Sequence, residues 1–346
     1  MMIDNFNLKY DVVGKLGSGS FSEVLKVKER QTGNIYAAKK LFKLHKNPND
    51  VCANRELEAL KKLDTHPNVM SLLDYFFDPN GTLIFLFDIM DSSLYDYIKD
   101  RNRRFPESQV KSFLYQLTCG LHHLHRNGLF HRDIKPENIL IKTTPGVTVN
   151  PLKSKILKLG DLGSVCLDRK LPHSAYVSTR WYRAPECLLT NGFYGPKMDI
   201  WALGCCFYEM LTFSPLFPGD NELDQLDKIH EILGTPSKMV LAKFKNKHFE
   251  CSFAFKPPIR FYKFLPSLSQ YGIDVLTKML MYHPDSRISV HKLVDHIYFE
   301  EFNKISRQSR VRRLDRECHS ELNLKFGYNR SGPPSRSSVD ILRKKY

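Results

Sequence analysis

The chain has 346 residues, of which 42% are hydrophobic, so it is long enough to bury a sizeable core. Its formal net charge of +15 raises the question of nucleic-acid or membrane-surface binding. No run of about 18 apolar residues suggests a membrane span, and residues 1–10 lack the apolar stretch of a signal peptide. The eight cysteines include no Cys-x-x-Cys pair, which argues against a zinc or redox site. We therefore expect a protein of the cytosol or nucleus with reduced thiols.

The predicted elements change character along the chain. Short β-branched and aromatic runs with turns occupy residues 10–90, with one helical pattern at 55–63. From residue 91 to 302 the apolar spacing is mostly helical. We therefore expect an α+β protein with an N-terminal extension at 1–9, a small β-rich lobe with one main helix, and a larger helical lobe. Residues 143–151 predict a surface loop between two short strands.

Much of the excess charge lies in the C-terminal segment. Residues 305–346 contain eleven Lys and Arg against four Asp and Glu, a net charge of +7. The stretch 331–338 is polar and rich in Pro, Gly and Ser, a composition that cannot support a core. We expect residues 303–346 to form a basic, partly disordered tail, with targeting or partner docking as the alternative role.

The first motif is a glycine-containing turn between two predicted strands. It reads Gly17-Ser18-Gly19-Ser20-Phe21-Ser22-Glu23-Val24. Two glycines allow a hairpin backbone to approach phosphates closely. By itself the motif fits a flexible hairpin equally well, and Ser22 stands where the usual pattern has a third glycine.

The second motif is a strand-like run that ends in Lys39, Tyr36-Ala37-Ala38-Lys39. Its ammonium can hold the α- and β-phosphates of a nucleotide as a point charge. A partly buried ammonium needs a carboxylate partner, and the helical pattern at 55–60 offers Glu56. We expect Lys39 and Glu56 to pair; the alternative is an exposed lysine and an ordinary surface glutamate.

The third motif carries the strongest signal. It reads His131-Arg132-Asp133-Ile134-Lys135-Pro136-Glu137-Asn138, and Asp161-Leu162-Gly163 follows after a loop and a short predicted strand. Phosphoryl transfer needs an oriented hydroxyl, metal ions on the phosphates, and cations near the departing oxygens. Asp133 suits the catalytic base and Lys135 the γ-phosphate. Asn138 and Asp161 suit Mg²⁺, which prefers oxygen ligands.

These residues resemble the catalytic and magnesium loops of eukaryotic protein kinases. The likeness spans residues 10–302 and implies the bilobal protein kinase fold, with ATP and Mg²⁺ as cofactors and proteins as substrates. It implies Asp133, Lys135, Lys39 and Glu56 as catalytic residues, and Glu186 and Arg287 as a buried structural pair. The implied ATP-binding set is Leu16, Gly17, Ser18, Gly19, Ser20, Phe21, Ser22, Glu23, Val24, Ala37, Lys39, Phe87, Asp88, Met90 and Leu140.

The subgroup is indicated by further segments. Residues 181–186 (Trp-Tyr-Arg-Ala-Pro-Glu), 215–219 (Pro-Leu-Phe-Pro-Gly) and 233–236 (Leu-Gly-Thr-Pro) resemble the cyclin-dependent and mitogen-activated kinase group. Residues 126–131 and 186–194 are most similar to its MAK-related family. The resemblance implies a serine/threonine kinase that favours proline after the target residue, and it adds the cilium as a candidate location.

The activation segment departs from this group. Relatives carry a Thr-x-Tyr phosphorylation motif, whereas this chain has Ser174-Ala175-Tyr176. By resemblance, Arg180 and Arg183, which follow Thr179, would meet a phosphate on Tyr176, whereas Arg55, Arg132 and a third arginine would meet one on Ser174. The third place holds Cys166. We hypothesise that activation depends more on Tyr176 than on Ser174, through an upstream kinase or autophosphorylation.

A second departure is Leu162, where most kinases have phenylalanine. By resemblance it packs near the helix that carries Glu56, and the smaller side chain is expected to loosen that coupling by about 1 kcal/mol. Two other functions remain open. One is a pseudokinase scaffold, disfavoured because the catalytic set is complete. The other is nucleic-acid binding, motivated by the charge but unsupported by any binding motif.

Overall fold

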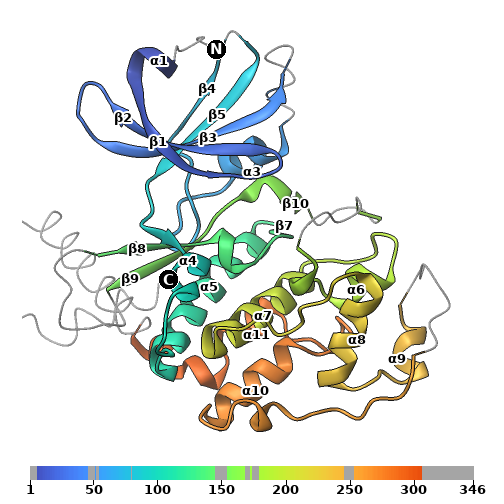
Figure 1. Cartoon of the computed structure of the whole chain (residues 1–346). Coiled ribbons are helices and arrows are strands. Elements are labelled where there is room, and N and C mark those ends of the chain that lie inside the picture. Colours follow the sequence, from blue (N-terminus) through green and yellow to red (C-terminus); the bar gives the residue numbers. More distant parts are fainter. Residues whose placement is uncertain are drawn as a thin grey trace, which may run out of the picture. The chain divides into compact units, whose positions relative to one another are not determined.

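The computed structural model describes residues 6–45, 51, 54–78, 80–144, 154–167, 172–173, 179–244 and 253–305. Chain contacts separate residues 1–299 from residues 300–346, and the elements named below belong to the first unit. That unit is a sheet-rich N-terminal region followed by a helical region, so the predicted α+β architecture is confirmed (Figure 1). Most of the predicted tail, residues 306–346, lies outside the described residues.

The N-terminal sheet has five antiparallel strands in the spatial order β1, β2, β3, β5, β4. Their bounds are β1 Tyr10–Ser18, β2 Ser22–Glu29, β3 Ile35–Leu44, β4 Asp74–Phe77 and β5 Thr82–Asp88. In this register Val24 lies opposite Lys39, and Ala37 lies opposite Phe87. Residues expected around a nucleotide therefore come from three adjacent strands.

A short helix, α1 (Phe6–Lys9), adds to the core of this sheet. Phe6 is buried, and its ring stacks on Tyr10 and meets Phe76 edge-on, each at a centroid distance of 5.3 Å. Such aromatic pairs stabilise beyond their buried area. Residues 6–9 belong to the predicted N-terminal extension, yet they take part in the packing of the sheet.

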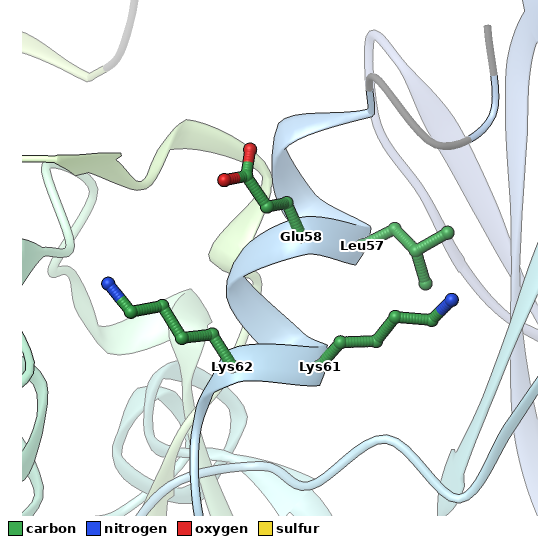
Figure 2. Close-up of a pocket in the computed structure, with 4 residues that line it drawn as sticks. All are labelled: Leu57, Glu58, Lys61 and Lys62. Carbon is green, nitrogen blue, oxygen red and sulfur yellow. The ribbon is translucent and has the colours of Figure 1, made fainter. Parts of the chain in front are cut away.

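Helix α3 (Arg55–Lys62) is the one long helix described between β3 and β4. Asn54 caps it by accepting a hydrogen bond from the backbone N–H of Leu57, which satisfies one of the free donors of the first turn. Glu56 is buried. Four other residues of this helix line a pocket of about 390 Å³: Leu57, Glu58, Lys61 and Lys62. Figure 2 shows Glu58 and Lys62 on one side of α3, and Leu57 and Lys61 on the other. The helix thus turns Glu56 inward and a mixed-charge face outward.

The helical region is built around α7 (Lys197–Thr212), whose buried residues lie on all its sides. Helix α5 (Glu107–Arg126) and helix α10 (Gln270–Met279) pack against it. The remaining helices are α4 Leu94–Lys99, α6 Pro185–Leu189, α8 Glu222–Leu233, α9 Lys238–Ala242 and α11 Val290–Val294, with 3₁₀ turns η3 Arg180–Tyr182, η4 Phe261–Lys263 and η5 Ile297–Phe299. Within the described residues, no helix is both long and apolar enough to cross a bilayer.

Short strands at the top of the helical region carry the chemical loops. Strands β6 (Ser92–Ser93), β8 (Ile139–Thr143) and β9 (Lys155–Leu159) form one sheet, and β7 (Leu129–Phe130) pairs with β10 (Cys166–Leu167). Between them lie the 3₁₀ turns η1 (Pro136–Asn138) and η2 (Leu162–Ser164). Strands β8 and β9 flank the predicted surface loop, of which residues 145–153 lie outside the described residues. The third motif therefore starts directly after β7 and ends directly before β8.

Candidate active site

The glycine-containing turn joins β1 to β2. The backbone N–H of Gly19 donates to the carbonyl of Ser22 at 2.8 Å, which closes the turn. A Cβ added at Gly17 would meet no atom within 4 Å, so there is open space beside this backbone. Phe21 at the tip is 72% exposed. The turn is thus free of packing on one side, as a phosphate-binding hairpin requires.

Lys39 bridges two carboxylates that are distant in sequence. Its Nζ lies 2.6 Å from Oε1 of Glu56 on α3 and 2.7 Å from Oδ1 of Asp161 before η2. Burial disfavours the charged ammonium, but the two carboxylates outweigh it, and the pKa of Lys39 lies above its usual value. Burial would likewise raise the pKa of Asp161, yet Lys39 holds it below the usual value. Burial raises the pKa of Glu56 above its usual value, and Lys39 offsets this only in part. Lys39 therefore lies between two carboxyl groups whose pKa values are shifted in opposite directions.

Asp133, Lys135 and Asn138 meet in the loop between β7 and β8. The Asn138 side-chain amide donates to the backbone carbonyl and to Oδ2 of Asp133, both at 2.8 Å. Lys135 Nζ lies 3.2 Å from the same carboxylate oxygen. An amide and an ammonium thus fix the orientation of the Asp133 carboxylate, as expected for a group that must align a hydroxyl.

Asp199, the third residue of α7, binds the backbone of this loop. Its carboxylate, 1% exposed, accepts backbone N–H bonds from His131 at 2.7 Å and Arg132 at 2.8 Å. Arg132 has φ 70°, a left-handed conformation that strains a residue other than glycine. His125 Nε2 also lies 2.9 Å from Asp199. Our sequence prediction gave Asp199 no role in the site, because its contacts lie 67 and 68 residues away along the chain.

His131 connects the catalytic loop to the segment of Asp161. Its Nε2 is 2.8 Å from the carbonyl oxygen of Gly160, and Asp161 itself has φ 53°. Leu162, the first residue of η2, is 1% exposed, and η2 packs against α3. Leu162 is therefore buried, and the segment of Asp161 contacts both the catalytic loop and the helix of Glu56.

The residues present suit a nucleotide with Mg²⁺. Asn138 and Asp161 offer amide and carboxylate oxygens, and the Asp161 side chain remains 46% exposed and accessible to an ion. The described residues contain no group of three or more His, Cys, Asp or Glu that could hold a metal by itself. Mg²⁺ takes its remaining ligands from phosphates and water, so two protein ligands are enough.

The expected adenine site lies between the sheet and β8. By resemblance, Val24 on β2 and Ala37 on β3 face this site. Leu140 on β8 packs against Gly160, since a Cβ added at Gly160 would come within 2.9 Å of the leucine side chain. Phe87 and Asp88 end β5. The carbonyl of Ile89, next to Met90, already accepts a hydrogen bond from Lys142 at 2.9 Å.

The regulatory arginines lie in different environments. Arg55 is exposed on the first turn of α3, whereas Arg132 is buried. Arg180 donates to the carbonyl of Asp220 at 3.2 Å, and Arg183 pairs with Glu222 at 3.3 Å. Thr179 is the residue before η3, while Ser174 and Tyr176 lie outside the described residues.

Glu186 and Arg287 form the buried pair that the resemblance implied. The two guanidinium nitrogens lie 2.6 and 2.9 Å from the two carboxylate oxygens, and both side chains are almost completely buried. Arg287 also donates to the carbonyls of Met281, Tyr282 and Lys197. This bidentate pair links α6, just after the activation segment, to the segment before α11.

The fold and site together define a protein kinase. A family model described as "Protein kinase domain" matches residues 10–299, and the chain belongs to this family. ATP and Mg²⁺ are the general cofactors of that domain.

Particular relatives narrow the class further. "MAPK/MAK/MRK overlapping kinase" from Homo sapiens is 43% identical over 303 residues, covering 87% of this chain and 70% of that protein. "Serine/threonine-protein kinase MAK" from Rattus norvegicus is 36% identical over 298 residues, covering 84% of this chain and 46% of that protein. "Cyclin-dependent kinase F-3" from Oryza sativa subsp. japonica is 36% identical over 305 residues, covering 86% of this chain and 67% of that protein. The chain is a protein serine/threonine kinase, and the predicted MAK-related resemblance is confirmed.

Proposed function

We propose that this kinase transfers the γ-phosphate of ATP to Ser and Thr hydroxyls through Asp133 as the base. The observation that carries the proposal is the orientation of the Asp133 carboxylate by Asn138 at 2.8 Å and Lys135 at 3.2 Å. A carboxylate held in this way can accept the hydroxyl proton while Lys135 balances charge on the phosphoryl oxygens.

The other residues divide the remaining work. Mg²⁺, when bound, neutralises charge on the phosphates, and we assign its protein ligands to Asn138 and Asp161. Lys39, held by Glu56 at 2.6 Å, is directed at the α- and β-phosphates. The turn at residues 17–23 covers the phosphates with backbone N–H groups, and Leu16 joins the residues around the adenine.

One experiment tests the catalytic assignment. Wild type and Asp133→Asn are incubated with radiolabelled ATP, Mg²⁺ and a degenerate peptide library. Asparagine keeps the hydrogen-bond geometry but cannot take a proton, so labelling by this variant should fall by at least about 100-fold. Equal labelling by the two proteins refutes the assignment.

We infer that the substrate site favours proline directly after the acceptor residue. The support is the likeness of residues 181–186 and 215–219 to the cyclin-dependent and mitogen-activated group. Matched Ser-Pro and Ser-Ala peptides measure this preference as a ratio of kcat/KM. A ratio near one contradicts the inference.

We also propose that phosphorylation of the activation segment regulates the enzyme, with Tyr176 more important than Ser174. Arg183 directly follows η3 and pairs with the exposed Glu222, a partner that a phosphate can displace. Cys166 occupies the place where a third arginine would serve Ser174. Tyr176→Phe should lower kcat more than Ser174→Ala, and the reverse order overturns the proposal.

The source of this phosphate is testable with the same inactive variant. If Asp133→Asn isolated from cells still carries phosphotyrosine at residue 176, an upstream kinase supplies it; if the phosphate is lost, the enzyme phosphorylates itself. Mass spectrometry of the 169–180 peptide distinguishes the two.

We propose that residues 303–346 are a tail outside the catalytic unit. The division of the chain after Phe299 supports this. Truncation after residue 305 should leave kcat unchanged, whereas a large loss contradicts the assignment. We place the enzyme in the cytosol or nucleus, with the cilium as a further location; imaging of tagged full-length and truncated chains tests whether the basic tail decides it.

A further inference from the structure

Three aromatic rings from separate parts of the chain meet beside the catalytic loop. Phe130 ends β7, His173 lies in the activation segment, and Tyr194 lies between α6 and α7. The His173 ring is 5.2 Å from the ring of Phe130 and 5.2 Å from that of Tyr194, and Phe130 and Tyr194 are 6.4 Å apart, centroid to centroid. These three residues are called the ring cluster below.

The guanidinium of Arg132 lies on the ring cluster. Its Cζ is 5.7 Å from the centroid of Tyr194, within the range of a cation–π contact, and both residues are buried. Arg132 directly precedes Asp133 and has the strained φ of 70°. Such a backbone persists only where its surroundings hold it. Asp199 holds the N–H group of Arg132, and the Tyr194 ring faces its side chain.

The main chain and a thiol fix the ring cluster in place. The N–H of His173 donates to the carbonyl of Gly192 at 2.9 Å. Gly192 has φ 78°, and an added Cβ would come within 2.3 Å of the His173 carbonyl, so only glycine permits this approach. Cys166 Sγ lies 3.5 Å from Nδ1 of His173, and Cys166 pairs with Phe130 across β10 and β7.

Cys166 borders the ring cluster through its contact with His173. Where the kinase resemblance implies a third arginine, the chain has Cys166. The aromatic face of Tyr194 lies beside Arg132, and such a face attracts a guanidinium without any phosphoryl group.

We propose that Tyr194 is a positioning residue for phosphoryl transfer, whose ring, tilted against that of His173, holds the Arg132 guanidinium and thereby fixes the orientation of Asp133. The inference rests on the proposed role of Asp133 as the base. It gives the enzyme a basal activity that depends on ring contacts instead of a phosphate at Ser174.

The test compares Tyr194→Leu with Tyr194→Phe by steady-state kinetics on the full chain. Leucine keeps apolar bulk but removes the π face, so kcat should fall about five- to tenfold, while the KM for ATP stays within about twofold. Phenylalanine keeps the ring, so kcat should stay within about twofold of wild type.

Tyr298→Leu is the matched control. Tyr298 is also buried and has a cation over its ring, Lys111 Nζ at 5.4 Å from the centroid, but it lies on η5, which packs on α5 and α10. Its replacement should lower the thermal unfolding temperature without changing kcat of the folded enzyme. A kcat loss equal to that of Tyr194→Leu would show a general packing effect and overturn the inference.

The remaining outcomes are also decisive. Unchanged kcat in Tyr194→Leu, or equal losses in Tyr194→Phe and Tyr194→Leu, overturns the inference. If Tyr194→Leu does not unfold cooperatively, the half-buried His173 replaces it: His173→Ser should lower kcat and His173→Phe should restore it, and equal kcat values for these two variants overturn the inference. Asp133→Asn reports separately on the proposed function, since an active Asp133→Asn refutes the base and leaves the ring contacts untouched.

Discussion

The catalytic loop is held by charge on one side and by rings on the other. Asp199 accepts two backbone N–H bonds from it, and two further cations of the domain, Lys39 and Arg287, each bind a carboxyl group at 2.6 Å. On the other side, Tyr194 offers an aromatic face to Arg132, and His173 contacts the Tyr194 ring. A buried charge that loses its partner is costly, whereas a ring contact loses strength gradually. We therefore expect single substitutions to be severe on the charged side and graded on the ring side.

Arg287→Met should have the largest effect, on stability. It leaves the Glu186 carboxylate buried and unpaired, which costs on the order of 3–5 kcal/mol of unfolding free energy. Urea unfolding measures the loss. The double variant Glu186→Met/Arg287→Met removes both charges and should recover part of it; a single-variant loss below about 1 kcal/mol contradicts the comparison.

Lys39→Met should have the next largest effect, mainly on activity. It removes the cation that binds Glu56 and Asp161 and that is directed at the phosphates. We expect kcat/KM for ATP to fall by about 10²–10³-fold, a loss typical of removing one electrostatic contact to a transition state. Lys40→Met, on the neighbouring and more exposed lysine, is the matched control and should retain activity. Similar losses in both variants argue against the assignment of Lys39.

Glu209 on α7 is a buried carboxyl group that pairs with a tyrosine hydroxyl. It accepts a hydrogen bond from the Tyr182 hydroxyl at 2.7 Å, and burial raises the pKa of Glu209 from 4.5 to about 7. Between pH 4.5 and 7 the folded chain keeps this proton while the unfolded chain loses it, so stability falls as pH rises. The total cost above pH 7 is about 3 kcal/mol.

Glu209→Gln should therefore stabilise the protein in a pH-dependent way. Glutamine keeps an acceptor for Tyr182 but cannot ionise, so the stability difference from wild type should grow between pH 4.5 and 7 and then stay constant. Denaturant unfolding at a series of pH values measures it. A difference that does not change with pH shows that Glu209 ionises as readily in the folded chain as in the unfolded one.

Leu162→Phe should have the smallest effect. The leucine is 1% exposed and η2 packs on α3, so the larger phenylalanine must displace neighbours at a cost of about 1 kcal/mol. Thermal unfolding and kcat measured together test this. A more stable and more active variant would mean instead that the leucine leaves the contact with the helix of Glu56 loose.

The sequence was most informative where chemistry restricts residue type within a short segment. The order of the sheet-rich and helical regions followed from periodicity, and helix 55–63 was predicted within one residue of α3 at Arg55–Lys62. Lys39, Glu56, Asp133, Asn138 and Asp161 were singled out by motif, and the structure brings them into two connected groups. The roles of these residues stay predictions until the variants are measured.

Contacts between distant segments were not predictable from local patterns. Nothing near Asp199 in the sequence indicates that it binds the N–H groups of the catalytic loop. Phe6 was placed in an extension because a four-residue helix has no periodicity to detect. The meeting of Phe130, His173 and Tyr194 depends on a turn at Gly192 and on strand pairing, which only the folded chain reveals.

The burial of α7 on all sides has a consequence for local unfolding. Twelve of its sixteen residues are buried, among them Asp199, on which the catalytic loop depends. In native-state hydrogen exchange, amides of such a helix open only with the whole domain, while exposed turns open far more often. The backbone amides of His131 and Arg132 should therefore exchange among the slowest in the chain, and the catalytic geometry should persist through the local opening of the surface around it.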